Sequence, residues 1–153
     1  MSNLLLGQST PAPLHYSPDI LFSIERKKNR TSFGIDIWNA YEISWINSNN
    51  SPQVGIIQLR IPSDSPNIIE SKSLKLYFNS LNMTVIHSEF ELCNMIEKDL
   101  SSRLGKSCVV TLFLPKDWEA LSTQTITGQC IDQNIEDQEP SNAAVTETLF
   151  SHL

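Results

Sequence analysis

The side chains best suited to chemistry stand together in one short run of this sequence. The run reads Glu70-Ser71-Lys72-Ser73, with Lys75 two positions later. A carboxylate can accept two N–H donors from one flat edge, such as the ring N–H and amino group of a guanine-like base. The two lysine ammonium groups could meet a phosphate nearby. These residue types therefore suit a site that binds a purine on one side and a phosphate on the other.

The element that would position this run is a helix that begins at it. Apolar side chains recur behind the run at the i, i+3, i+4, i+7 spacing of one helical face, at Leu74, Tyr77, Phe78 and Leu81. The first N–H groups of a helix lack partners and its dipole is positive at that end, so anionic ligand groups are favoured there. The same residues also have a purely structural explanation. Asn67 and Glu70 stand at capping-box spacing, and lysines on a helix face are commonly solvated.

The run Glu70-Ser71-Lys72-Ser73-Leu74-Lys75-Leu76-Tyr77, continuing into Asn79-Ser80, resembles the signature of the QueF-type NADPH-dependent nitrile reductases. Further stretches look like the long, two-module form of that family, so that the resemblance covers essentially the whole chain. These stretches are Leu6-Gly7-Gln8-Ser9-Thr10, Asp36-Ile37-Trp38, Tyr41-Glu42-Ile43-Ser44-Trp45-Ile46-Asn47, Pro52-Gln53-Val54, Glu147-Thr148-Leu149 and Ser151-His152-Leu153.

The resemblance implies an oxidoreductase that converts 7-cyano-7-deazaguanine to 7-aminomethyl-7-deazaguanine with NADPH, a step of queuosine biosynthesis and hence of tRNA modification. Carried onto matching positions, it implies that Ile69, Glu70 and Ser71 contact the deazaguanine, with Glu70 pairing the donors of its guanine-like edge. Ser71 and Lys72 would meet the NADPH, with Lys72 near a phosphate. No metal ligand is implied.

The family's catalytic groups are not expected in this chain. In the family a cysteine thiolate adds to the nitrile to give a thioimide, an aspartic acid supplies a proton, and two NADPH molecules deliver hydride. The resemblance places that cysteine and acid just after the match at Ser151-His152-Leu153, and a His-Glu pair later still. We therefore expect these groups in a C-terminal catalytic half, and we expect this chain alone to be inactive.

The cysteines and histidines present here do not replace those groups. Cys93, Cys108 and Cys130 fall within an expected helix and two expected strands, where buried thiols behave as inert hydrophobes. The three cysteines are widely spaced, which suggests neither a disulfide framework nor a zinc site. The histidines are isolated in sequence, at positions His15, His87 and His152.

Composition narrows the class of protein. A chain of 153 residues with 40% apolar content is enough for one globular domain with its own core. The net charge of −6 argues against direct binding of nucleic acid, because neutralising phosphates needs a basic face. No apolar run has the length of a membrane helix and the start lacks a signal-peptide pattern, so we expect a cytoplasmic protein without membrane contact.

The pattern of elements predicts an α+β fold. We expect a hairpin of strands at 35–47 and 54–61, helices from Glu70 and at 88–104, and strands at 108–114 and 123–132. The second helix would bury Phe90, Cys93, Ile96 and Leu100 and end at Gly105. The order ββααββ gives a four-stranded antiparallel sheet with both helices on one face. This agrees with the tunnelling fold that the resemblance implies.

We expect three regions along the chain. Residues 1–33 would form an extended N-terminal arm, whose basic cluster Arg26-Lys27-Lys28 with Arg30 is either solvated or set against a cofactor phosphate. Residues 34–132 would form the tunnelling-fold module, and residues 133–153, polar and acidic up to residue 142, would form a linker toward the catalytic half. Edge strands left unpaired by a single module predict oligomerisation, with a homodimer expected.

Two functions remain open at this point. The first is the N-terminal substrate- and cofactor-recognition module of a nitrile reductase, which acts with the C-terminal half of the same protein. The alternative is a non-catalytic module of the same fold that binds a purine or mediates assembly. The residues that would carry either function are those around Glu70.

Overall fold

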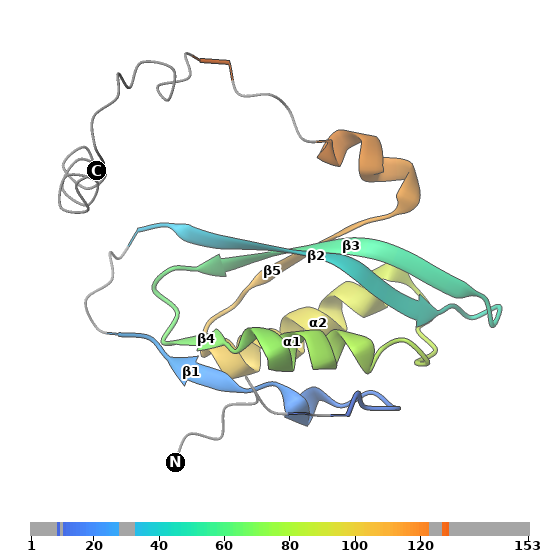
Figure 1. Ribbon diagram of the computed structural model, residues 1–153, viewed down its shortest axis with the longest axis horizontal. Coiled ribbons are helices and arrows are strands. Elements are labelled where there is room, and N and C mark those ends of the chain that lie inside the picture. Colours follow the sequence, from blue (N-terminus) through green and yellow to red (C-terminus); the bar gives the residue numbers. More distant parts are fainter. Residues whose placement is uncertain (1–8, 10, 28–32, 123–126, 129–153) are drawn as a thin grey trace, which may run out of the picture. The chain divides into compact units, whose positions relative to one another are not determined.

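The computed structural model describes residues 9, 11–27, 33–122 and 127–128 (Figure 1). The chain divides into two compact units, Met1–Leu121 and Ser122–Leu153. The elements described below all belong to the first unit. None of the helices in the described ranges has the length and apolar character needed to cross a membrane.

A long β-hairpin forms the main sheet. Strands β2 (Ile35–Ile46) and β3 (Pro52–Pro62) pair antiparallel, which confirms the predicted hairpin. The turn between them is held by Asn47, whose side-chain oxygen accepts hydrogen bonds from the N–H groups of Asn49 and Ser51, both at 3.0 Å. The register shifts between Ala40 and Ile43, where a bulge interrupts the pairing. This bulge lies on the strand that faces the predicted helix.

Three strands of the predicted four-stranded sheet lie within the described residues. Strand β5 (Val109–Phe113) pairs antiparallel with β3, which gives the order β2-β3-β5. The expected fourth strand at 123–132 lies outside the described residues except at 127–128. The connection after β5 forms a 3-10 helix, η2 (Pro115–Leu121).

A second, two-stranded ribbon was not predicted. Strand β1 (Ser23–Glu25) follows a short 3-10 helix, η1 (Pro18–Ile20), and pairs antiparallel with β4 (Asn67–Ile69). The arm therefore contains a strand that is part of the fold. Three-residue strands carry too little pattern to be recognised in sequence, and β1 is defined by its partner rather than by its own residues.

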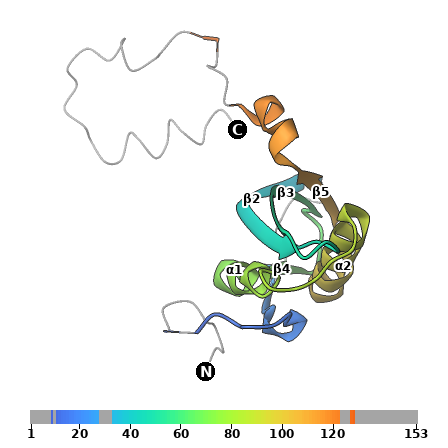
Figure 2. The same ribbon diagram turned by 90° about the vertical axis from the view of Figure 1, so that its right-hand side faces the viewer.

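Both helices cover one face of the main sheet, as predicted (Figure 2). Helix α1 (Ser71–Asn79) buries Leu74, Tyr77 and Phe78, and Leu81 just beyond it is fully buried, so the predicted apolar face is confirmed. Helix α2 (Glu89–Leu104) ends at Gly105, whose φ of 72° is the left-handed conformation that glycine adopts readily.

The predicted buried stripe of α2 is partly wrong. Phe90 is 76% exposed and Cys93 is half-buried, whereas the fully buried residues of this helix are Leu92, Ile96, Leu100 and Leu104. Residues four positions apart form one continuous row on a helix. The leucine row at this spacing takes the core face and turns Phe90 toward solvent.

Tyr77 joins the two helices. Its hydroxyl donates to Asp99 Oδ2 at 2.7 Å, and the hydroxyl of Tyr16 donates to the same oxygen at 2.6 Å. Burial and the hydrogen bond to the Asp99 carboxylate raise the pKa of Tyr77 well above its usual value. The pKa of Tyr16 is raised by the same causes. The N-terminal segment, α1 and α2 thus meet at one carboxylate.

Candidate functional site

Glu70 is the N-cap of α1. Its backbone is extended (φ −67°, ψ 128°), it follows β4 directly, and its Oε2 atom accepts a hydrogen bond from the Ser73 N–H at 2.7 Å. A negative charge at this position is favourable because the helix dipole is positive there. The residue is only 4% exposed. The structure therefore confirms a carboxylate at the helix start, but places it inside the protein.

The second oxygen of Glu70 has no hydrogen-bond partner. Oε1 is buried, and no donor lies within bonding distance of it among the described residues. A buried polar atom without a partner costs roughly 1–3 kcal/mol, and more when it is charged. Folding alone does not explain this cost, because a serine would cap the helix without burying a second polar atom.

The alternative based on a capping box is wrong in its detail. Asn67 is not the N-cap, because it lies in β4 and its side-chain amide donates to the carbonyl of Arg103 at 3.1 Å. Glu70 itself caps the helix. Part of the structural explanation holds, since one carboxylate oxygen is used by the helix. The picture of a carboxylate with both oxygens available to a ligand therefore does not hold.

A cavity of about 530 Å³ lies beside the helix start, between α1 and β2. Its size is within the range of small-molecule sites. The lining combines apolar and aromatic side chains with a few polar ones; the residues are Trp38, Asn39, Ala40, Tyr41, Glu42, Leu59, Ser71, Leu74, Lys75, Phe78 and Asn79. The interrupted pairing at Tyr41 and Glu42 falls on this wall.

The predicted site residues take different places. Ser71 is exposed and lines the cavity, whereas Glu70, Lys72 and Ile69 are not part of its lining. Lys72 is half-buried on the first turn of α1, and Ile69 is 2% exposed within the core. The structure thus places Glu70 and Ser71 at the helix start and buries the Ile69 side chain in the core.

Sequence reasoning gave no role to the β2 residues on the far wall. Trp38 and Tyr41 belong to stretches that carry the family resemblance, and Lys75 follows the chemical run by two positions. The sequence held no clear signal for this wall, because the main apolar positions Ile37, Tyr41 and Ile43 keep one alternation across the bulge that follows Ala40. A bulge of this kind turns side chains away from the regular pleat and toward the helix.

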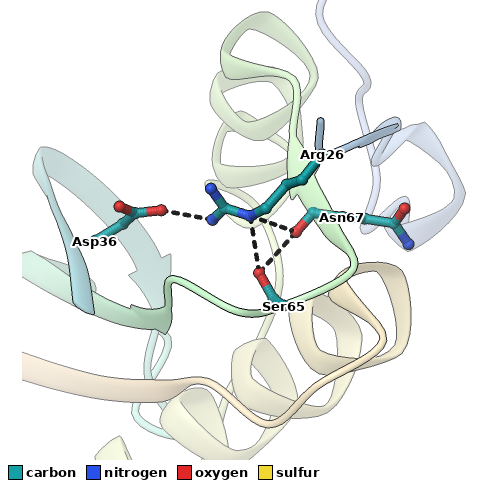
Figure 3. Close-up of polar contacts among 4 residues, drawn as sticks. All are labelled: Arg26, Asp36, Ser65 and Asn67. Carbon is teal, nitrogen blue, oxygen red and sulfur yellow. Dashed lines mark hydrogen bonds and ion pairs between the residues drawn. The ribbon is translucent and has the colours of Figure 1, made fainter. Parts of the chain in front are cut away.

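Arg26 is neither solvated nor set against an open surface. Its side chain is 5% exposed, its Nη2 pairs with Asp36 Oδ2 at 2.5 Å, and its Nε donates to Ser65 Oγ at 3.1 Å and to the carbonyl of Asn67 at 3.3 Å (Figure 3). The solvated interpretation of the basic cluster is therefore wrong for this residue, and the interpretation based on a cofactor phosphate stays a prediction. Arg26 links the β1–β4 ribbon to the start of β2.

The other basic residues of that cluster do not share the buried position of Arg26 within the described part of the chain. Lys27 is exposed, and Lys28 and Arg30 lie outside the described residues. The buried arginine fixes the strand that leads into Glu70.

A comparison with models of protein families shows which family this chain belongs to. A family model described as nitrile reductase, 7-cyano-7-deazaguanine-reductase N-term, matches residues 13–112. The chain belongs to this family. The match includes the β1–β4 ribbon, both helices and β5. The nitrile reductase resemblance inferred from the run at Glu70 is confirmed.

Relatives agree with the family model. A protein of Acinetobacter baumannii strain ATCC 17978, named NADPH-dependent 7-cyano-7-deazaguanine reductase, is 39% identical over 97% of this chain and 62% of its own length. Proteins of the same name from Acinetobacter baumannii strain SDF and Bordetella avium are 45% and 35% identical, over 84% and 100% of this chain. The chain spans 49% and 63% of these two.

The two described cysteines are shielded from solvent to different degrees. Cys93 is half-buried and Cys108 is buried. Burial raises the pKa of both thiols, which keeps them protonated near neutral pH. Cys130 and His152 lie outside the described residues. Among the described residues, no cluster of His, Cys, Asp and Glu could hold a metal ion.

Proposed function

We propose that this chain is the N-terminal recognition module of an NADPH-dependent nitrile reductase that converts 7-cyano-7-deazaguanine to 7-aminomethyl-7-deazaguanine in queuosine biosynthesis. The observation that carries the proposal is Glu70, whose Oε1 is buried without a partner at the start of α1. An acceptor of this kind suits the N–H donors of a guanine-like edge. The family match and the names of the relatives support the substrate and the cofactor.

In this proposal each site residue has one role. The Glu70 carboxylate accepts hydrogen bonds from the ring and amino N–H groups through Oε1, while Oε2 stays on the Ser73 N–H. Ser71, exposed at the rim of the cavity, lies between base and cofactor and contacts both. Ile69 contributes its backbone.

The first turn of α1 fits a nucleotide cofactor. Ser71 is exposed there and Lys72 follows it, and the N-terminus of a helix favours phosphate oxygens. Ser71 and Lys72 would hold the NADPH in this way. When bound, NADPH supplies the hydride that reduces the nitrile carbon. The residues of this chain bind and orient; the thiolate and the acid come from a C-terminal catalytic half.

The proposal includes the complete tunnelling fold. A fourth strand at 123–132 beside β5 would extend the β2-β3-β5 sheet, and unpaired outer strands would join further modules in a homodimer. The site would then form between modules. The competing function is a module that binds a purine or mediates assembly without turnover, and it would use the same residues around Glu70.

The test is a calorimetric titration of 7-cyano-7-deazaguanine into this chain, alone and mixed with the C-terminal half of the Acinetobacter baumannii relative. We expect binding and NADPH oxidation in the mixture, and no NADPH oxidation by the chain alone. Glu70→Ala should weaken binding by about 2–3 kcal/mol, the scale for losing a charged hydrogen-bond partner. An unchanged dissociation constant would remove Glu70 from the site, and binding without turnover in the mixture would favour the competing function.

A further inference from the structure

The N-terminal segment before β1 is fixed to α1 at two buried serines. The N–H of Phe22 donates to Ser73 Oγ at 3.1 Å, and the N–H of Ser17 donates to Ser80 Oγ at 3.2 Å. Ser73 is at the start of α1 and Ser80 is its C-cap. The segment therefore runs along the helix in the opposite direction.

The two attachments use the same chemistry. Each serine hydroxyl accepts from one backbone N–H of the segment and donates to the carbonyl three residues before it. Ser73 donates to the Glu70 carbonyl at 2.8 Å, and Ser80 donates to the Tyr77 carbonyl at 2.6 Å. The two serines are 0% and 1% exposed. Each one is therefore a natural control for the other.

The attachments differ in what lies beside them. At Ser73, the Glu70 N–H donates to the Phe22 carbonyl at 2.8 Å, the Glu70 carbonyl accepts from the Ser73 hydroxyl, and Glu70 Oε2 accepts from the Ser73 N–H. Phe22 and Ser73 thus bind the N–H and one carboxylate oxygen of Glu70, and Ser73 shares the Glu70 carbonyl with the N–H of Leu74. Oε1 is the one group of Glu70 that is left without a partner among the described residues.

We propose that Ser73 is a positioning residue for ligand binding by Glu70, because its buried hydroxyl fixes both Phe22 and the Glu70 carbonyl and so aims Oε1. This inference rests on the proposed function for its ligand. Its structural half, the immobilisation of Glu70 by Ser73, is independent of any ligand. Ser80, with the same bonds at the far end of α1, stabilises the segment without acting on Glu70.

The first experiment needs no ligand. Ser73→Ala and Ser80→Ala are compared by residue-resolved amide hydrogen exchange in the full chain. Loss of the Ser73 hydroxyl frees Phe22, so the Glu70 N–H should exchange about tenfold faster in Ser73→Ala than in Ser80→Ala. Equal exchange at Glu70 in the two variants would overturn the proposal.

The second experiment measures affinity for 7-cyano-7-deazaguanine, in the mixture with the relative's C-terminal half described above. Ser73→Ala should weaken binding about tenfold, and Ser80→Ala by less than about twofold, at a similar loss of thermal stability. Equal affinities would overturn the positioning role. A wild-type chain that binds nothing would count against the proposed function, while the exchange comparison still decides the immobilisation of Glu70.

A second pair of variants guards against misfolding. Ser73→Cys and Ser80→Cys keep a side chain of similar shape with a much weaker hydrogen-bonding group. If Ser73→Ala fails to fold, the cysteine pair gives the same comparison with the packing retained. We expect the same order of exchange rates and affinities, and the reverse order would overturn the proposal.

Discussion

The two helices of this protein begin in opposite ways. Helix α2 starts with Ser88, whose Oγ accepts from the Glu91 N–H at 3.0 Å, while Glu91 accepts from the His87 N–H at 2.8 Å. These bonds span at most four residues and lie on the surface. Helix α1 starts with the buried Glu70, whose carboxylate accepts from the Ser73 N–H and whose own N–H donates to the Phe22 carbonyl. Phe22 and Ser73 are 51 positions apart in the chain.

The α2 start is therefore stabilised by neighbouring residues, whereas the α1 start is stabilised by tertiary contacts. The two hydrogen bonds that cap the α2 start join residues within about one turn of each other, so that start depends on its own residues. The α1 start depends on β1 and carries an unpaired oxygen at a cost to stability. Costs of this kind are typical of ligand sites, where surrounding structure maintains what folding alone would remove.

The largest expected effect comes from breaking the support of α1 at Arg26. Arg26→Met removes the charged partner of Asp36 and the bonds to Ser65 and Asn67, so the free energy of unfolding should fall by about 3 kcal/mol. Urea denaturation measures this. The control is Lys106→Met, since its pair with Asp64 is 43% exposed on both sides and should contribute far less to stability. Equal losses would show that the Arg26 pair does not support the site.

Glu70→Gln tests whether the α1 start is built for a ligand. Glutamine keeps an acceptor oxygen for the Ser73 N–H but loses the charge and sets an amide group in the place of one oxygen. We expect affinity for 7-cyano-7-deazaguanine to fall about 10- to 100-fold, with a change in unfolding free energy below about 1 kcal/mol. A loss of stability with unchanged affinity would make Glu70 a cap and nothing more.

The stability of the protein at alkaline pH should depend on Tyr77, which joins the two helices. Its pKa is raised in the folded protein by burial and by the Asp99 carboxylate, so folding favours the protonated hydroxyl. The resulting stability is complete below the unfolded pKa of about 10 and is lost as pH rises above it. We expect unfolding free energy to decline above pH 10, and to decline less steeply in Tyr77→Phe, which should cost about 1.5 kcal/mol at neutral pH. The same slope in both proteins would assign the decline to other groups.

The smallest effect is expected at the α2 start. Ser88→Ala removes one exposed cap and should lower the unfolding free energy by about 1 kcal/mol, the usual value for such a change. Ligand affinity should stay the same, because the capping hydrogen bonds of α2 involve only residues 87–91. Thermal unfolding and the calorimetric titration check the two parts. A clear loss of affinity would break the contrast between the two helix starts.

Much of the fold could be predicted from the sequence, because the patterns that specify its helices and turns are local. The hairpin of β2 and β3, the apolar face of α1 and the glycine that ends α2 were predicted from periodicity and turn residues. The error at Phe90 arose where two apolar rows competed for the core on one helix. Strand β1 was missed because three residues hold no pattern of their own.

For the site, sequence reasoning identified the family and the run at Glu70, since residue types and their order are what a signature contains. Tertiary structure decided what those residues do. It made Glu70 the N-cap with one oxygen used and one left over, buried Arg26 against Asp36, and placed Trp38 and Tyr41 across the cavity from Ser71. Burial and hydrogen-bond partners depend on segments that are distant in the chain. A local sequence pattern does not specify which of these segments will pack together.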